Sequence, residues 1–282
     1  MELARKSAIT TVVLSSVLMI LFCFSTFITP IGTPSIVASV SAPVNFWKSP
    51  TVTPLGSLNW AGYALNGSVD SVTLVKGYWI QPTISCPTKA LQVASFWIGM
   101  DGLTSPTVEQ TGTLAQCYKG SASYSAWYEF YPNSSVNIKS LVIHPGDIMF
   151  AEVKYTSVIG KFNATIQDLS TGKSFSIRVA DPAALRNSAE WIAEAPSSPS
   201  CATNAYDICP LANFGVVNFG RGPSIPTGTD VAKISGDSGP IAKFGKVDSL
   251  EMVSFASTPK AIESAIKIPG SSFAVTWASA GP

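Results

Sequence analysis

The residues best suited to chemistry in this chain are carboxylates and one amide, on strand-like segments rich in aromatic residues. They stand in three strings, Gln110-Thr-Gly, Trp127-Tyr-Glu129-Phe-Tyr131-Pro and Glu190-Trp-Ile-Ala-Glu194. The whole chain contains one histidine, His144. A hydrolase without a usable histidine must activate water with a carboxylate. The sequence therefore favours hydrolysis led by a carboxylate over chemistry led by histidine.

The other common signatures of hydrolase, metal and phosphate chemistry are absent from the sequence. It contains no G-x-S-x-G elbow, no H-E-x-x-H, no Cys/His catalytic signature and no glycine-rich phosphate loop. His144 stands in a Pro-Gly turn, where a histidine is most often solvated. These absences disfavour serine triads, thiol catalysis and histidine-ligated zinc. We expect no metal ion and no cofactor.

Strand alternation decides which of these side chains can share a surface. If the segments are extended, three of them carry a tryptophan-bearing face, and two of those faces also carry a carboxylate. The residues on these faces are Trp60 in the first segment, Trp97 and Asp101 in the second, and Trp127, Glu129 and Tyr131 in the third. Aromatic walls with a few polar anchors are typical of a substrate groove. The alternative is a sandwich with amphipathic tryptophans at its rim.

The remaining glutamates fit a paired role less well. Glu190 and Glu194 share a face but lie about 13 Å apart along an extended strand. A retaining glycosidase needs its two carboxylates about 5–5.5 Å apart, so these two cannot be such a pair. Glu109 points away from Gln110 in an extended segment, and we expect it to be peripheral.

Short strands must position these residues. β-branched and aromatic residues recur at about two-residue periodicity, between turns marked by Gly, Pro, Asn and Asp. This pattern predicts strands at 60–65, 72–80, 94–99, 107–112, 123–131, 148–156, 161–168, 174–179, 189–194, 214–219, 249–255 and 271–278. Residues 220–246 are rich in Gly and Pro and predict a long loop. An all-β chain of this kind is typical of a β-sandwich.

Composition supports export and excludes nucleic acid as a partner. Hydrophobic residues make up 46% of the 282-residue chain and charged residues only 12%, well below the usual quarter. Removing residues 1–42 takes away two basic and one acidic residue, which leaves a net charge of zero. There is consequently no basic stripe for nucleic acid or an anionic membrane.

The N-terminus predicts a targeting segment. Arg5 and Lys6 precede a charge-free run from Ser7 to Trp47, with a strongly apolar stretch at 12–28. Small residues then offer cleavage sites at 37–39 or 40–42. We interpret 1–42 as a signal peptide, with a retained membrane anchor as the alternative, because a span needs roughly 20 residues. Residues 43–58 are expected to be an exposed lead-in, and 59–282 the β-sandwich domain.

The cysteines predict disulfides. Cys23 lies in the leader, and an even set of four remains, as expected in an oxidising compartment. Four cysteines allow three pairings. The short loop from Cys201 to Cys209 suggests a local bridge, which leaves Cys86 with Cys117. A zinc site is the alternative, but the spacings contain no C-x-x-C pair.

Several sequence blocks, taken in order along the chain, resemble a known family. They are Asn59-Trp-Ala-Gly, Trp97-Ile-Gly-Met-Asp-Gly102, Gln110-Thr-Gly112, Ala126-Trp-Tyr-Glu-Phe-Tyr-Pro132, Pro145-Gly-Asp147, Ala189-Glu-Trp-Ile-Ala-Glu194 and Phe214-Gly. Together they resemble the eqolisins, the glutamic endopeptidases best known from fungi. The likeness continues more faintly through Phe273-Ala-Val-Thr-Trp277.

The resemblance implies a concanavalin-like β-sandwich of two packed antiparallel sheets, with the active site on a concave face. It implies a catalytic pair at Gln110 and Glu194, in a secreted acid endopeptidase. It also implies a cleft lined by the residues that alternation had singled out, namely Trp60, Trp97, Asp101, Trp127, Glu129 and Tyr131. We expect protein or peptide substrates, a monomer, and membrane contact only if the N-terminal segment is retained.

The chemistry implied is physically reasonable. Glu194 can take a proton from water and later hand it to the leaving amine. The amide NH₂ of Gln110 can donate to the oxyanion and stays neutral at any pH. With an ordinary pKa of about 4.3, a glutamate remains a base in acid where histidine is protonated. This is the basis on which we expect activity at acidic pH.

Two departures and two alternatives accompany the resemblance. Many relatives carry an acid just after Gln-Thr-Gly and another before the Ala-Trp-Tyr-Glu block, whereas this chain has Thr113, Leu114 and Ser125 there. A carbohydrate-binding protein could use the same aromatic concave face. A glycosidase could pair Glu129 with Asp101 or Glu194.

Overall fold

The computed structural model describes residues 50–201, 206–222, 225, 229–267 and 271–281. The expected leader and residues 43–49 of the lead-in lie outside these residues. Within them the structure is built from strands, with two short 3₁₀ helices, η1 (Pro199–Cys201) and η2 (Ile241–Phe244). No helix in the described part of the chain is long and apolar enough to cross a membrane.

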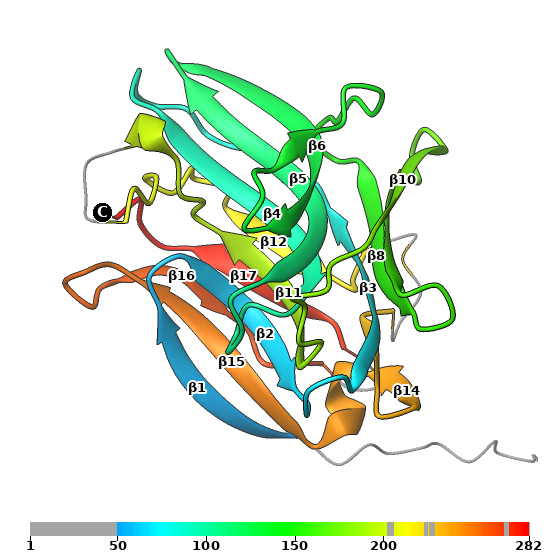
Figure 1. Cartoon of the computed structure of the whole chain (residues 1–282). Coiled ribbons are helices and arrows are strands. Elements are labelled where there is room, and N and C mark those ends of the chain that lie inside the picture. The colour runs from blue at the N-terminus through cyan, green and yellow to red at the C-terminus, as the bar shows by residue number, and fades with distance from the viewer. Residues whose placement is uncertain (1–49, 202–205, 223–224, 226–228, 268–270, 282) are drawn as a thin grey trace, which may run out of the picture. The chain divides into compact units, whose positions relative to one another are not determined.

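The strands form two layers. In the first layer the strands pair side by side in the order β1 (Thr51–Ser57), β15 (Lys246–Val253), β2 (Trp60–Asn66), β11 (Ser188–Glu194), β4 (Gln92–Met100), β5 (Val108–Tyr118), β6 (Ser121–Tyr131) and β7 (Val136–Asn137). Figure 1 shows β2, β11, β4, β5 and β6 side by side in this order. All of these pairs are antiparallel except β1–β15, which is parallel.

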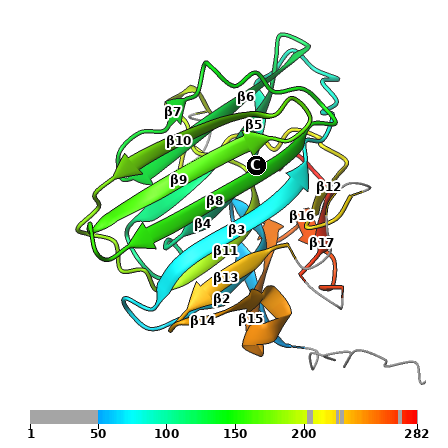
Figure 2. The ribbon, with the colours of Figure 1, turned by 90° about the vertical axis from the view of Figure 1, so that its right-hand side faces the viewer.

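The second layer covers the first. It contains, in pairing order, β10 (Lys173–Val179), β9 (Lys161–Asp168), β8 (Ile148–Thr156), β3 (Val72–Ile80), β13 (Val231–Ile234) and β14 (Asp237–Pro240). Figure 2 shows this layer from its outer side. β12 (Val216–Phe219), β17 (Phe273–Trp277) and β16 (Pro259–Glu263) lead from β3 back to β15. Through these three strands the two layers are hydrogen-bonded into one continuous sheet that folds over on itself. The expected β-sandwich is confirmed.

Alternating side chains build the core between the layers. In β8, Met149, Ala151 and Val153 point inward and are fully buried, while the residues between them are more exposed. β9 alternates in the same way. Large aromatic side chains fill the space, including Phe96 against Phe214 in an edge-to-face contact. The buried indole nitrogen of Trp79 donates to the Thr113 hydroxyl across the layers at 3.1 Å, so this polar group is satisfied.

Five of the described strands were not predicted, namely β1, β7, β13, β14 and β16. β1 forms within the expected exposed lead-in, where Pro54 disfavoured a strand; β1 pairs only with β15, and an edge strand tolerates proline. β13 and β14 form a short hairpin inside the expected long loop. Ser235 and Gly236 make its turn, both with positive φ, as a two-residue hairpin turn requires. β7 has two residues and β16 has five, and strands this short show no clear two-residue pattern in the sequence.

The disulfides are those expected from spacing. Cys86 and Cys117 join the segment before β4 to the end of β5, and Cys201 and Cys209 close the loop that follows β11. Because all four cysteines are oxidised, none is available as a thiolate ligand, so the zinc alternative does not hold.

Candidate active site

The register of the first layer aligns the candidate residues in three parallel rows on one face. Side chains of directly paired residues point to the same face of a sheet. One row contains Glu129, Gln110, Gly99 and Glu190. The next contains Trp127, Gly112, Trp97 and Ile192, and the third Ser125, Leu114, Ser95, Glu194 and Trp60. Gln110 and Glu194 therefore stand on two sides of the Trp97 row.

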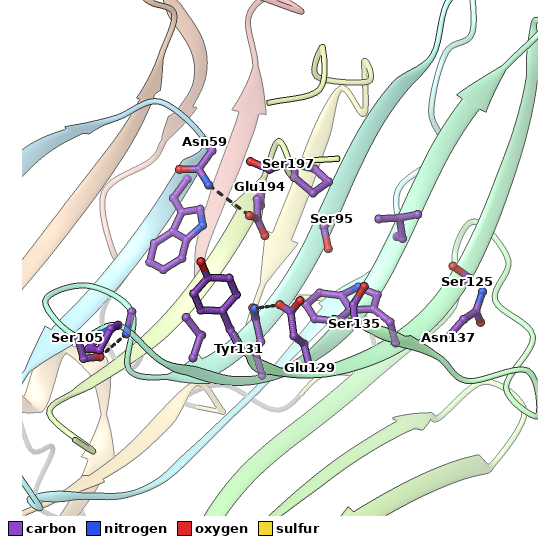
Figure 3. A pocket seen from close by; sticks show the side chains of 18 residues that line it. Asn59, Ser95, Ser105, Ser125, Glu129, Tyr131, Ser135, Asn137, Glu194 and Ser197 are labelled. Carbon is purple, nitrogen blue, oxygen red and sulfur yellow. Dashed lines mark hydrogen bonds between the residues drawn. The ribbon is translucent and has the colours of Figure 1, made fainter. Parts of the chain in front are cut away.

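A cleft of about 540 Å³ opens over these rows. Its lining residues are Asn59, Trp60, Ser95, Gly102, Ser105, Pro106, Val108, Gln110, Leu114, Ser125, Trp127, Glu129, Tyr131, Ser135, Asn137, Glu194, Pro196 and Ser197. Figure 3 shows Glu194, Tyr131 and Glu129 directed into the same hollow. Of the lining residues that the structure describes, Glu129 and Glu194 are the charged ones.

The Gln110 amide is held by Glu129. Its Nε2 donates to Glu129 Oε2 at 2.6 Å, between two directly paired residues of β5 and β6. A carboxylate accepts but does not donate, so this bond fixes which end of the amide is the NH₂ group. Burial raises the pKa of Glu129, while the hydrogen bond from Gln110 acts in the opposite direction.

Two donors hold the Glu194 carboxyl in place. The Trp97 indole nitrogen donates to Oε2 at 2.7 Å, and the Asn59 amide donates to Oε1 at 3.3 Å (Figure 3 shows the second). Burial raises the pKa of Glu194 to about 7, against the lowering effect of these bonds, and the nearby Glu129 adds to the rise. The expectation of an ordinary glutamate pKa at this position is therefore wrong. A carboxyl titrating near 7 is suited to proton transfer in both directions.

Five of the six expected cleft residues lie at the site. Trp60, Trp127, Glu129 and Tyr131 line the cleft with Gln110 and Glu194. Trp97 is fully buried behind the lining, where it contacts Trp60 edge to face at 5.0 Å and holds Glu194. The aromatic residues therefore have two roles: some line the cleft, and Trp97 donates a hydrogen bond to Glu194.

Asp101 is the exception. It is fully buried and does not line the cleft. The backbone turns into the left-handed region here, with φ of 68°, so strand alternation no longer predicts where the side chain points. Its carboxylate accepts from the backbone nitrogens of Arg186 and Asn187 at 2.7 and 2.8 Å. Asp101 thus anchors the segment that leads into β11, and this correction also removes it as a partner for Glu129 in a glycosidase.

The position expected for Glu109 needs a similar correction. It does point away from Gln110, but that side of β5 is the interior, and Glu109 is fully buried. Burial raises its pKa to about 9, with the Asp101 charge adding to the rise. Glu190 is also fully buried, and burial raises its pKa well above the ordinary value.

Sequence patterns missed the polar and apolar rim of the cleft. Asn59 belonged to a sequence block, and Leu114 and Ser125 were noted as departures near the expected cleft, but none was named as a cleft residue. Leu114 and Ser125 reach the cleft through the cross-strand row that also contains Glu194, and Asn59 reaches it from the turn before β2. Alternation could have predicted both positions, because Leu114 shares a face of β5 with Gln110 and Ser125 shares a face of β6 with Glu129. Pro196 and Ser197 follow β11 in a loop and carried no signal.

Comparison with known proteins gives a consistent result. The sequence model of the peptidase A4 family matches residues 58–247. The chain is 32% identical to aspergillopepsin-2 of Aspergillus niger over 199 residues, which cover 62% of this chain and 67% of that protein. It is 34% identical to scytalidopepsin B of Scytalidium lignicola over 164 residues, 55% of this chain and 58% of that protein.

Solved structures share the fold. Scytalido-glutamic peptidase with a transition-state analogue inhibitor is 24% identical, with a TM-score of 0.63, and the match covers 79% of this chain and 99% of that chain. Aspergilloglutamic peptidase from Aspergillus niger is 27% identical, with a TM-score of 0.52, over 66% of this chain and 99% of that one.

Proposed function

This chain belongs to the peptidase A4 family of glutamic endopeptidases, also called eqolisins, and on that premise we propose that Glu194 and Gln110 form its catalytic pair. The observation that carries the assignment is the pair's placement in one cleft, with each side chain held by a neighbour. Glu194 is held by Trp97, and Gln110 is held by Glu129. Two groups fixed in this way can act on one peptide bond between them.

The proposed reaction needs no group beyond these and a water molecule. Ionised Glu194 takes a proton from the water, and the hydroxide oxygen bonds to the carbonyl carbon of the peptide. The carbonyl oxygen becomes an oxyanion and accepts a hydrogen bond from the Gln110 NH₂ group. Protonated Glu194 then gives its proton to the peptide nitrogen, and the carbon–nitrogen bond breaks. Glu194 is left ionised, ready for another cycle.

Glu129 has a positioning role in this proposal. A glutamine amide could present either its oxygen or its NH₂ group to the substrate, and only the NH₂ group stabilises an oxyanion. The bond from Gln110 Nε2 to Glu129 selects the orientation with the NH₂ group on the cleft side shared with Glu129. The second hydrogen of that NH₂ group is then available to the substrate.

The pH range in which we expect activity follows from the pKa values of the carboxyl groups at and near the site. Because the pKa of Glu194 is raised to about 7, a useful fraction of ionised base requires weakly acidic rather than strongly acidic solution. The buried Glu109 and Glu190 also favour acidic solution. Because their pKa values are raised, the folded protein is most stable when both carboxyl groups are protonated.

Peptides are the proposed partners, and secretion the proposed location. Structures of family members hold a peptide-based transition-state analogue in one case and the tripeptide Ala-Ile-His in another. The two disulfides of this chain suit an oxidising compartment. We propose that the N-terminal segment directs export, that residues 59–282 are the catalytic domain, and that it acts as a monomer.

The test uses residues 43–282 with a denatured protein as substrate between pH 2 and 7. Glu194→Gln is expected to lower kcat/KM by about a thousandfold, and Gln110→Ala by about a hundredfold or more. Glu152→Gln on β8 and Gln167→Ala on β9 make the same chemical changes away from the cleft and should cut like the unaltered protein. A folded protein that cuts nothing at any of these pH values would refute the assignment.

A further inference from the structure

A second hollow lies beside the cleft. Its lining residues are Leu55, Gly56, Ser57, Asn59, Trp60, Gly102, Leu103 and Leu250, none of them charged. Asn59, Trp60 and Gly102 also line the first cleft, so Trp60 stands between the two spaces. Leu55, Gly56 and Ser57 belong to β1 or its end, before residue 58, where the match to the peptidase A4 family begins.

The hollow and the cleft lie on one continuous sheet face. The row that contains Trp127 and Trp97 continues from Ile192 through Gly62 of β2 and Leu250 of β15 to Leu55 of β1. Since directly paired residues share a face, one surface runs from the catalytic residues to the outermost strand. Leu250, Leu103 and Trp60 also pack in the same hydrophobic cluster as Trp97 and Trp127.

We propose that this second hollow is a remote substrate subsite that binds an apolar side chain of an extended peptide. The inference rests on the proposed peptidase function. From β11, which carries Glu194, to β1 there are three strand spacings, about 14 Å in all. An extended peptide advances about 3.3 Å per residue, so the bound side chain lies roughly four residues from the scissile bond.

The charge and exposure of the hollow decide the chemistry of its occupant. Leu55 is 38% exposed although it is apolar, so a side chain resting on it would remove apolar surface from water. Among the described residues, none that lines the hollow offers a charge to pair with a charged side chain. The substrate class is therefore a peptide of at least five or six residues with a Leu-like residue about four positions from the cut.

Binding there also contacts the turn that holds the catalytic carboxyl. Ser57 Oγ accepts from the backbone nitrogen of Trp60 at 3.0 Å and donates to Asn59 Oδ1 at 3.3 Å. Asn59 in turn donates to Glu194. Remote binding energy can be used in this way to raise the rate at the reacting centre, so we expect longer substrates to gain in kcat/KM.

The test compares peptides that share a cleaved core and differ at the fourth residue from the cut. That residue is Leu, Ser or Lys, placed on the N-terminal or the C-terminal side, and kcat/KM is measured at pH 5. For the unaltered protein we expect Leu to exceed Ser by about fivefold to tenfold on one side. Leu55→Asp should abolish this preference and favour Lys, because an Asp with an ordinary pKa is ionised at pH 5.

Val52→Asp is the matched control. Val52 lies on the same strand and is similarly exposed, at 42%, but alternation places it on the opposite face from Leu55. It should keep the preference for Leu. Equal rates for Leu and Ser on both sides, or the same change in both variants, would overturn the subsite while leaving the peptidase function intact. Failure to cut even the core would overturn both.

Discussion

At the scale of single residues, the site depends on how each carboxyl is surrounded. Glu194 accepts two hydrogen bonds, which favour its ionised form, yet burial outweighs them and raises its pKa to about 7. Glu129 adds to that rise because a second negative charge nearby disfavours ionisation. The same Glu129 holds the Gln110 amide. One residue thus influences both members of the proposed pair.

Glu129→Gln should therefore move the pH profile as well as the rate. Removing the charge lowers the pKa of Glu194, so the acidic limb of kcat/KM against pH should shift to lower pH. We also expect kcat to fall by about tenfold, because a glutamine can donate as well as accept and no longer fixes the Gln110 amide. Kinetics across pH 3–8 measure both effects. A lower rate with an unmoved limb would mean that Glu129 only packs against its neighbours.

At the scale of elements, β4, β5 and β11 bring the two proposed catalytic positions together. The pair comes from strands that are not neighbours, and β4 between them presents Trp97 toward Glu194. This arrangement requires a close approach of β5 to Trp97. A Cβ atom added at Gly112 would lie 2.3 Å from the Phe96 carbonyl oxygen and 2.5 Å from Trp97 Cβ. Only glycine allows this spacing.

Gly112→Ala is expected to displace Trp97 and with it Glu194. We predict a loss of about 1–3 kcal/mol in the free energy of unfolding and a larger relative loss of kcat/KM. Thermal melting and peptide kinetics would measure the two. Gly56→Ala on β1 is the control for the melting measurement, since a Cβ there meets its nearest atom at 3.8 Å, an ordinary contact. If both variants melt alike, the close approach at Gly112 does not strain the sheet.

At the scale of the whole molecule, buried carboxyls connect stability to pH. Glu109 and Glu190 are both fully buried. Burial raises the pKa of Glu109 to about 9 and that of Glu190 well above its ordinary value. A group with a raised folded-state pKa contributes its full stability below the unfolded pKa of about 4.5, and loses it as pH rises through the folded pKa.

The melting temperature should therefore fall steadily as the pH is raised from about 5 to 9. Glu109→Gln keeps the shape of the side chain and cannot ionise, so it should flatten this dependence and melt at a higher temperature than the unaltered protein at pH 8. Glu152→Gln on β8, whose carboxyl is only partly buried, should follow the unaltered curve. A Glu109→Gln curve parallel to the unaltered one would show that Glu109 does not carry the effect.

What the sequence determined is what depends on local geometry and side-chain chemistry. Two-residue alternation predicted most strands and put Trp127, Glu129 and Tyr131 on one face, because a strand's side chains alternate whatever its partners are. The order of the sequence blocks indicated the family, and the spacing of the cysteines predicted both disulfides.

Tertiary structure decided what depends on which strands are neighbours and on what surrounds each charge. Asp101 lies outside the cleft because the backbone turns at the end of β4. Glu109 lies in the core because that face of β5 packs against the second layer. The pKa of Glu194 and the bond from Gln110 to Glu129 exist only once β5, β6 and β11 are in register. The row from Trp127 to Leu55 joins residues from seven strands, and no local pattern in the chain encodes that alignment.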